Sequence, residues 1–164
     1  MKALTHAELR DLVAKTTAHS GAWRHLVRHQ AGHRFYEELT PADPDLEGRV
    51  GFWLICWMDG HDTGFHDHGS SSGVVEVVEG QLCDERPAPG GGIRARTYGA
   101  GASFQFAPRD IHRLSHAGSG PATSIHAYSP PLGQMGAYAG GPDGKLRRTL
   151  VSYAEELRPL ETAG

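Results

Sequence analysis

The amino-acid sequence predicts an all-β-dominated fold, a β-barrel preceded by short helices. The 164 residues include 22 glycines and 10 prolines, which mark many tight turns between short elements. Bulky, β-prone runs recur between these turns in the later part of the chain, whereas the apolar residues near the start follow helical spacing. We therefore expect one domain over residues 1–164, with a helical segment at 1–34 and the β-barrel at 35–164.

The first helix has a clear start signal. Thr5 and Glu8 fit a capping box, in which each side chain accepts a hydrogen bond from the backbone N–H of the other residue. Apolar residues follow at helical spacing, which predicts a helix from about residue 6 to residue 18. A second short helix is expected around Trp23, ending before Gly32.

The strands are expected after a turn-rich loop at residues 41–48. Two runs are typical of buried strands, VGFWLICWM and GVVEVVEG, and the second is expected to continue through residues 81–86. The stretch PAPGGG predicts a hairpin loop, and residues 132–141 are expected to form a loop beside the pocket. Further strands are expected at 93–99, 102–108, 111–116 and 123–131, with a last strand or short helix in the tail KLRRTLVSYAEEL.

Composition excludes several classes of partner. The net charge is −3 and basic residues form no block, so nucleic acid is not an expected partner. The first residues contain no apolar stretch of signal-peptide type and no later run could span a bilayer, so we expect a cytoplasmic protein without membrane contact. Two cysteines, Cys56 and Cys83, make no disulfide framework and are expected to remain thiols.

Histidines in the segment GHDTGFHDHGSSSG are the strongest functional signal. His66 and His68 are two residues apart, so on a strand both imidazoles point to one face of the sheet and can share a metal ion. Imidazole is a good ligand for iron, zinc, copper or nickel. His112, which follows a proline turn and opens a strand, is the preferred third ligand, and His116 and His126 are its rivals.

These stretches resemble the cysteine dioxygenase family, the thiol dioxygenases of the cupin superfamily of jelly-roll β-barrels. The resemblance covers roughly residues 50–135, in the strings LICWMDGHDTGFHDHGSSSGVVEVVEGQL, DIHRLSH and SIHAYSPPL. It implies that the three histidines bind Fe(II) and that the enzyme uses O2 to oxidise a small thiol to its sulfinic acid. It also implies a monomer whose partners are the thiol and O2. The implied iron ligands are His66, His68 and His112.

The resemblance further implies an outer relay of Ser124, His126 and Tyr128 that directs the tyrosine hydroxyl toward the iron. Their spacing of two residues places all three on the same face of a strand, although a packed barrel tyrosine is the alternative for Tyr128. Gly73 stands where most cupins have a glutamate ligand and where some members have a cysteine joined to this tyrosine. We therefore expect no such crosslink and a ligand set of neutral histidines, which favours a thiolate substrate.

The sequence leaves the thiol open. Cysteine-specific members hold the substrate carboxylate with an arginine upstream of the core strand, but that place falls near Glu37, with Arg34 as the nearest arginine. If Glu37 or Glu38 lines the pocket, a cationic thiol such as cysteamine or ergothioneine is favoured, and aromatic residues could wall its site. The candidate substrate-binding residues are Arg34, Tyr36, Glu37, Phe65 and Met135.

Three other functions stay open at this point. The first is an ordinary cysteine dioxygenase with a displaced arginine. The second is a non-catalytic cupin that binds a metal or a small ligand, and the third is a zinc or nickel cupin with isomerase or hydrolase activity. The relay speaks against the last two, because a binding pocket has no need of it.

Overall fold

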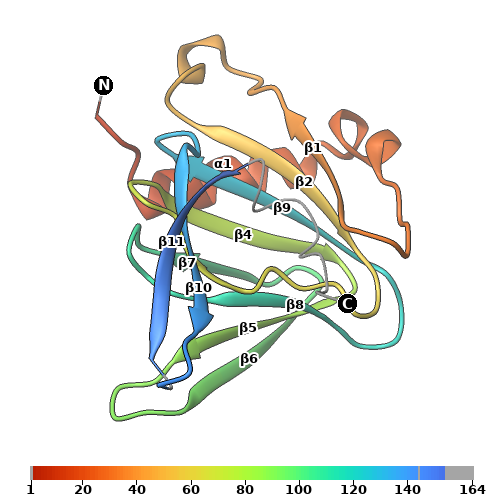
Figure 1. Ribbon diagram of the computed structural model, residues 1–164. Helices are drawn as coiled ribbons and strands as arrows, with labels where there is room; N and C mark the ends of the chain where they lie inside the picture. Colours follow the sequence, from red (N-terminus) through yellow and green to blue (C-terminus); the bar gives the residue numbers. More distant parts are fainter. Residues whose placement is uncertain (1, 144, 154–164) are drawn as a thin grey trace.

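β-Strands dominate the computed structural model, which describes residues 2–143 and 145–153 (Figure 1). The elements, in chain order, are α1 (His6–Ala18), η1 (Ser20–Ala22), η2 (Arg24–Leu26), β1 (Phe35–Leu39), η3 (Pro44–Leu46), β2 (Gly51–Trp57), β3 (Phe65–Asp67), β4 (Ser72–Glu79), β5 (Gln81–Pro87), β6 (Ile93–Gly99), β7 (Ser103–Phe106), β8 (Arg113–Ala117), β9 (Ala122–Ser129), β10 (Gln134–Gly140) and β11 (Leu146–Ser152). No helix within the described residues is long and apolar enough to cross a membrane.

The strands form two facing layers. One layer is a five-stranded antiparallel sheet with the order β1-β2-β9-β4-β7. The other consists of two three-stranded sheets, β11-β10-β3 and β6-β5-β8, which isolated bridges join along the β3–β8 seam. The layers are not closed into one barrel by strand pairing among the described residues, but the arrangement is that of the expected jelly roll.

Helix α1 covers the outer face of the five-stranded sheet, where it packs against β4 and β9 (Figure 1). Every residue of β2 is buried as a result, because one face of the strand meets the helix and the other meets the interior. Leu54 belongs to the apolar cluster on the helix side, whereas Ile55 and Trp57 belong to the cluster between the layers. This alternation decides which side chains of β2 can reach a site between the sheets.

The start of α1 is as predicted, because the reciprocal hydrogen bonds of the capping box join Thr5 and Glu8. The second helix expected around Trp23 is absent. The chain makes two short 3₁₀ turns there instead, η1 and η2. The tail expected as a strand or helix forms β11, and its residues after 153 lie outside the described part of the chain.

Two strand predictions need correction. The run predicted to continue through residues 81–86 is two strands, because Gly80, with a φ of +71°, turns the chain from one layer into the other. A Cβ atom at Gly80 would overlap the carbonyl oxygen of Pro121, so the turn requires glycine. Residues 132–141 do not form a loop, because most of them belong to β10, which pairs with β3 on one side and β11 on the other.

Candidate metal centre

Three histidines from two segments meet between the layers. His66 lies on β3 and His68 directly follows this strand, so both side chains point inward. His112 is paired with His66 through two backbone hydrogen bonds, of 2.9 and 3.0 Å between nitrogen and oxygen. Directly paired residues present their side chains on the same face of a sheet, which places the third imidazole beside the first two. All three residues are buried.

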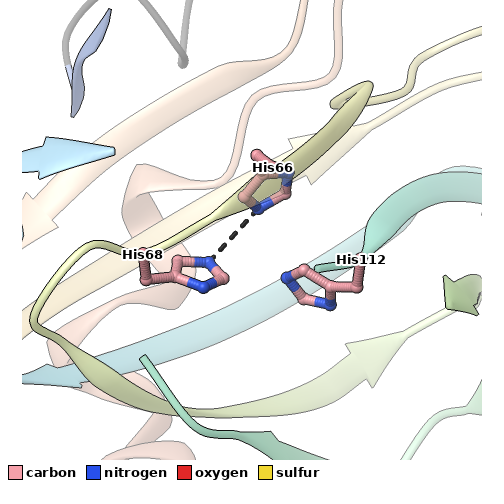
Figure 2. Close-up of side chains that lie close together, drawn as sticks. All are labelled: His66, His68 and His112. Atoms are coloured by element: carbon pink, nitrogen blue, oxygen red, sulfur yellow. Dashed lines mark hydrogen bonds between the residues drawn. The ribbon is translucent and has the colours of Figure 1, made fainter. Parts of the chain in front are cut away.

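The ring nitrogens have the spacing that a metal ion requires. One nitrogen from each imidazole lies within 4.8 Å of the others, and the Nε2 atoms of His66 and His68 are 3.2 Å apart. Two ligands at about 2.1 Å from one metal lie roughly this far from each other. His112 Nε2 is buried without a hydrogen-bond partner in the described structure, and Figure 2 shows it facing the other two rings. These donors fit a non-haem metal ion.

Burial keeps the imidazoles of His66 and His68 neutral and therefore able to bind a metal. Burial lowers the pKa of His66 and of His68 well below the usual value of 6.5, and the charge on neighbouring histidines lowers both further. Neutral imidazole is the form that offers a lone pair to a cation.

Two histidines of the cluster have different outer partners. The Nδ1 atom of His66 lies 3.0 Å from the carbonyl oxygen of Gly64, while that of His112 lies 2.7 Å from Asp84 Oδ1. Asp84 is buried, which by itself raises its pKa, but the hydrogen bonds from His112 and Arg86 outweigh burial and lower it. Sequence reasoning missed Asp84. The sequence did contain a signal for it: Asp84 is two residues after the apolar Leu82 on the same strand, so both side chains face inward.

The predicted relay is assembled on β9. Ser124 Oγ is 2.7 Å from His126 Nε2, and His126 Nδ1 is 3.0 Å from the Tyr128 hydroxyl. Trp57 on β2 extends the chain, because its indole N–H donates to Ser124 Oγ at 2.9 Å. Burial lowers the pKa of His126 to about 3, so its ring stays neutral. The indole is a relay member that sequence reasoning did not find.

The two rival third ligands lie elsewhere or are otherwise engaged. His116 lines no part of the cavity beside the three histidines, and its Nε2 atom is 2.6 Å from the carbonyl oxygen of Gly120. His126 does line the cavity, but both of its ring nitrogens are taken up by the relay.

The cavity has a volume of about 30 Å³, and two of the five candidate substrate-binding residues line it. Arg34, just before β1, is 4 % exposed and lines the cavity, with its guanidinium carbon 5.4 Å from the centre of the Trp57 ring. Met135 on β10 closes another side. The described residues that line it are Arg34, Ile55, Trp57, Thr63, His66, His68, Phe106, His112, Leu114, His126, Tyr128, Leu132 and Met135.

The other three candidates do not reach this cavity. Glu37 is exposed and pairs with Leu54, which faces the helix side. Glu38 is on the other face of β1 but is also exposed and does not line the cavity, so neither acid that would favour a cationic substrate is placed there. Tyr36 packs on Trp53 with 5.9 Å between ring centres. Phe65 precedes His66 on β3 and therefore points away from the metal cluster.

The residue of β4 paired with Tyr128 of the relay is Gly73, so this position supplies no thiol beside the tyrosine. Gly73 pairs directly with Tyr128, and the ring of Phe106 fills the space that a Cβ atom would take. Cys56 belongs to the cluster on the helix side and Cys83 lies on β5, and both are free thiols. That Tyr128 carries no cysteine crosslink stays a prediction.

Comparison with known sequences points to one family. A family model described as cysteine dioxygenase type I matches residues 6–140. Cysteine dioxygenase type 1 of Danio rerio is 28 % identical over 127 residues, and that of Homo sapiens is 24 % identical over 130 residues. These alignments cover 70 % and 71 % of this chain and 63 % and 64 % of the relatives, so the chain spans slightly less than two thirds of their length.

Solved structures show the same fold at low identity. A protein from Thermus thermophilus aligns with a TM-score of 0.55 and 15 % identity over 66 % of this chain and 93 % of its own. A cupin superfamily protein from Desulfitobacterium hafniense aligns with a TM-score of 0.52 and 13 % identity over 66 % and 87 % of the two chains. The jelly roll is therefore a cupin fold, and because the family model spans most of its length, the chain belongs to the cysteine dioxygenase type I family.

Proposed function

We propose that this protein is a non-haem iron dioxygenase that oxidises a small, carboxylate-bearing thiol to its sulfinic acid. The observation that carries the proposal is the convergence of three buried imidazoles, a buried arginine and a tyrosine hydroxyl on one small cavity. Family membership supports the reaction type, and the iron and the thiol are inferred from the chemistry of the residues.

His66, His68 and His112 would hold Fe(II), which when bound supplies the redox centre at which the thiolate and O2 react. Three neutral ligands leave the positive charge of the ion uncompensated, which favours an anionic sulfur. Both oxygen atoms end on sulfur, and all the electrons that O2 accepts come from that sulfur. The reaction therefore requires no organic cofactor or external reductant.

The relay orients a hydrogen-bond donor toward the reacting groups. Trp57 has only a donor and Ser124 accepts from it, which leaves the serine hydroxyl to donate to His126 Nε2. His126 then donates through Nδ1 to the Tyr128 oxygen, so the phenol O–H stands as the donor at the cavity end of the chain. A fixed donor of this kind stabilises negative charge that develops on oxygen, without reorganisation during the reaction.

The substrate class follows from the charge of the cavity. Arg34 places a buried positive charge there, and this charge also lowers the pKa of His66 and His126. Among the residues that the structure describes, none that lines the cavity is a carboxylate. A carboxylate on the substrate would form a charge-assisted, bidentate pair with the guanidinium, whereas the ammonium of cysteamine would be repelled.

Cavity size restricts the thiol further. A volume of about 30 Å³ suits a metal ligand of a few heavy atoms and is small for ergothioneine, which carries an imidazole ring and a trimethylammonium group. The described lining of the cavity also offers no carboxylate to the amino group of cysteine. We therefore infer that cysteine and its des-amino analogue 3-sulfanylpropanoate both bind, each through its carboxylate.

Oxygen consumption by the iron-loaded protein tests this proposal. Cysteine and 3-sulfanylpropanoate should support turnover and gain two oxygen atoms by mass spectrometry, whereas cysteamine should react poorly. Replacing Arg34 by Met should raise KM for both acids by about two orders of magnitude, the contribution of a charge-assisted pair. Glu37→Gln is the matched control, because it also removes a charge near the start of β1. Glu37 is exposed and does not line the cavity, so this change should leave KM unchanged.

Two results would contradict the proposal. Faster turnover of cysteamine than of either acid would assign the site to a cationic thiol. Binding of iron without oxidation of any of the three thiols would favour the alternative of a non-catalytic, metal-binding cupin.

A further inference from the structure

The three ligand histidines differ in what holds their second nitrogen. His66 uses a neutral backbone carbonyl, and the Nδ1 atom of His68 is buried with no hydrogen-bond partner in the described structure. Among the contacts between described residues, His112 is the one ligand histidine that meets a carboxylate, with 2.7 Å between its Nδ1 atom and Asp84 Oδ1. Within the described residues, the metal cluster therefore has one negatively charged group in contact with it, on one specific ligand.

Asp84 is held in a fixed orientation. It is 4 % exposed, and a carboxylate buried to this extent requires compensating hydrogen bonds. One oxygen contacts His112, and the other accepts from Arg86 Nε at 2.8 Å. Arg86 is itself anchored, because its Nη2 atom donates to the backbone carbonyl of Gln105 on β7 at 2.9 Å.

We propose that Asp84 is a positioning residue of the metal centre, and that Arg86 sets its orientation. The carboxylate keeps the proton of His112 on Nδ1, which turns the lone pair of Nε2 toward the metal position. It also increases electron donation by this imidazole, which offsets the absence of a carboxylate among the ligands themselves. The inference rests on the proposed metal centre and is independent of the thiol chemistry.

The donor-only nature of arginine makes the proposal testable. In an Asp84→Asn variant, Arg86 Nε–H still requires an oxygen, so the amide oxygen turns toward Arg86 and the amide NH2 faces His112. His112 Nδ1 must then accept, which moves the ring proton to Nε2 and blocks the metal position. An asparagine in place of the aspartate of a catalytic triad acts through such a tautomer change. Removing the guanidinium as well frees the amide to rotate back.

Cobalt(II) affinity, measured by chelator competition on metal-free protein, reports this effect without any turnover. The Asp84→Asn variant should bind cobalt about 10- to 100-fold more weakly than the wild type. The double variant Asp84→Asn/Arg86→Met should regain about tenfold of this loss, because the amide oxygen can again accept from His112. Asp110→Asn is the matched control, because Asp110 also faces Arg86, at 3.6 Å, without contacting His112.

A second measurement keeps the proposal testable if Asp84→Asn fails to fold. Nitrogen NMR shifts of the metal-free wild type should show His112 as the Nδ1–H tautomer. The Nε2–H tautomer in the wild type would overturn the proposal, and so would wild-type cobalt affinity in folded Asp84→Asn. An equal loss in the single and double variants would overturn the role of Arg86. Failure of the wild type to bind cobalt at all would instead refute the metal centre.

Discussion

At the scale of single residues, the direction of hydrogen bonds matters as much as the distances between atoms. The relay from Trp57 to Tyr128 begins at the indole N–H of Trp57, which can only donate. The hydrogen bonds from His112 through Asp84 likewise end at the guanidinium of Arg86, which can only donate. Each chain therefore imposes a proton position on a histidine, His126 in one case and His112 in the other. Both histidines border the same cavity.

Tyr128→Phe tests the relay at this scale. The phenyl ring keeps the packing against His68, whose ring centre lies 5.5 Å from that of Tyr128, but removes the donor. We expect kcat to fall about 100-fold, the cost of losing one fixed donor, with iron content and KM near those of the wild type. Steady-state oxygen consumption combined with metal analysis measures this. An unchanged kcat would assign Tyr128 to packing alone.

At the scale of elements, an ion pair between Arg148 and Asp67 joins the hairpin of β10 and β11 to β3, the strand that carries His66. Asp67 lies between His66 and His68 on the opposite face of β3, and accepts from both Arg148 on β11 and Tyr138 on β10. Gly136 pairs directly with Asp67, and a methyl group there would overlap Arg148 Nε and Asp67 Oδ2. The glycine leaves the space in which the ion pair forms.

Replacing Arg148 by Met tests this connection. The change leaves a buried carboxylate with fewer hydrogen bonds, which costs about 2 kcal/mol of unfolding free energy. Urea denaturation measures the loss, and hydrogen exchange should show faster opening of β10, where Ala137 pairs with His66. Arg147→Met is the control, because Arg147 pairs with the exposed Asp143 instead. Equal stability of the two variants would contradict the role of the ion pair.

Gly136→Ala tests the same element without removing a charge. The added methyl must displace Arg148 or separate β10 from β3, so we expect a lower urea midpoint and a lower cobalt affinity. Gly133→Ala is the control, because a Cβ atom at Gly133 would meet no atom within 4 Å. Unchanged values for Gly136→Ala would show that the hairpin can adjust at no cost.

At the scale of the whole molecule, burial of neutral histidines between the layers couples stability to pH. His66, His68 and His126 all have a pKa lowered by burial, to about 3 for His126. In the unfolded chain each has a pKa near 6.5, so below that pH the unfolded state binds more protons than the folded state.

The metal-free protein should therefore lose stability as the pH falls below about 6.5 and continue to lose it toward the lowered values. Each buried histidine contributes up to about 1.4 kcal/mol per pH unit in this window. Urea midpoints at pH 7.5 and 5.5 measure the effect, and His126→Gln should reduce the difference between them. Equal midpoints at the two pH values would show that these rings take up protons without unfolding.

Much of this molecule is determined locally and could be predicted from the sequence. The capping box fixes the start of α1, the turn glycines separate the strands, and the alternation on β9 aligns Ser124, His126 and Tyr128. The spacing of His66 and His68 likewise depends only on the geometry of one strand. Such features follow from neighbouring residues, whose relative positions the backbone sets.

The tertiary structure decided what depends on pairing between distant segments. The bridge between β3 and the start of β8 selected His112 over its rivals, and the register of β1 against β2 sent Arg34 into the cavity and Glu37 away from it. Asp84 reaches His112 only because Gly80 turns β5 into the opposite layer. A one-residue shift of register reverses which face a side chain occupies, and the sequence of a single strand does not contain its register.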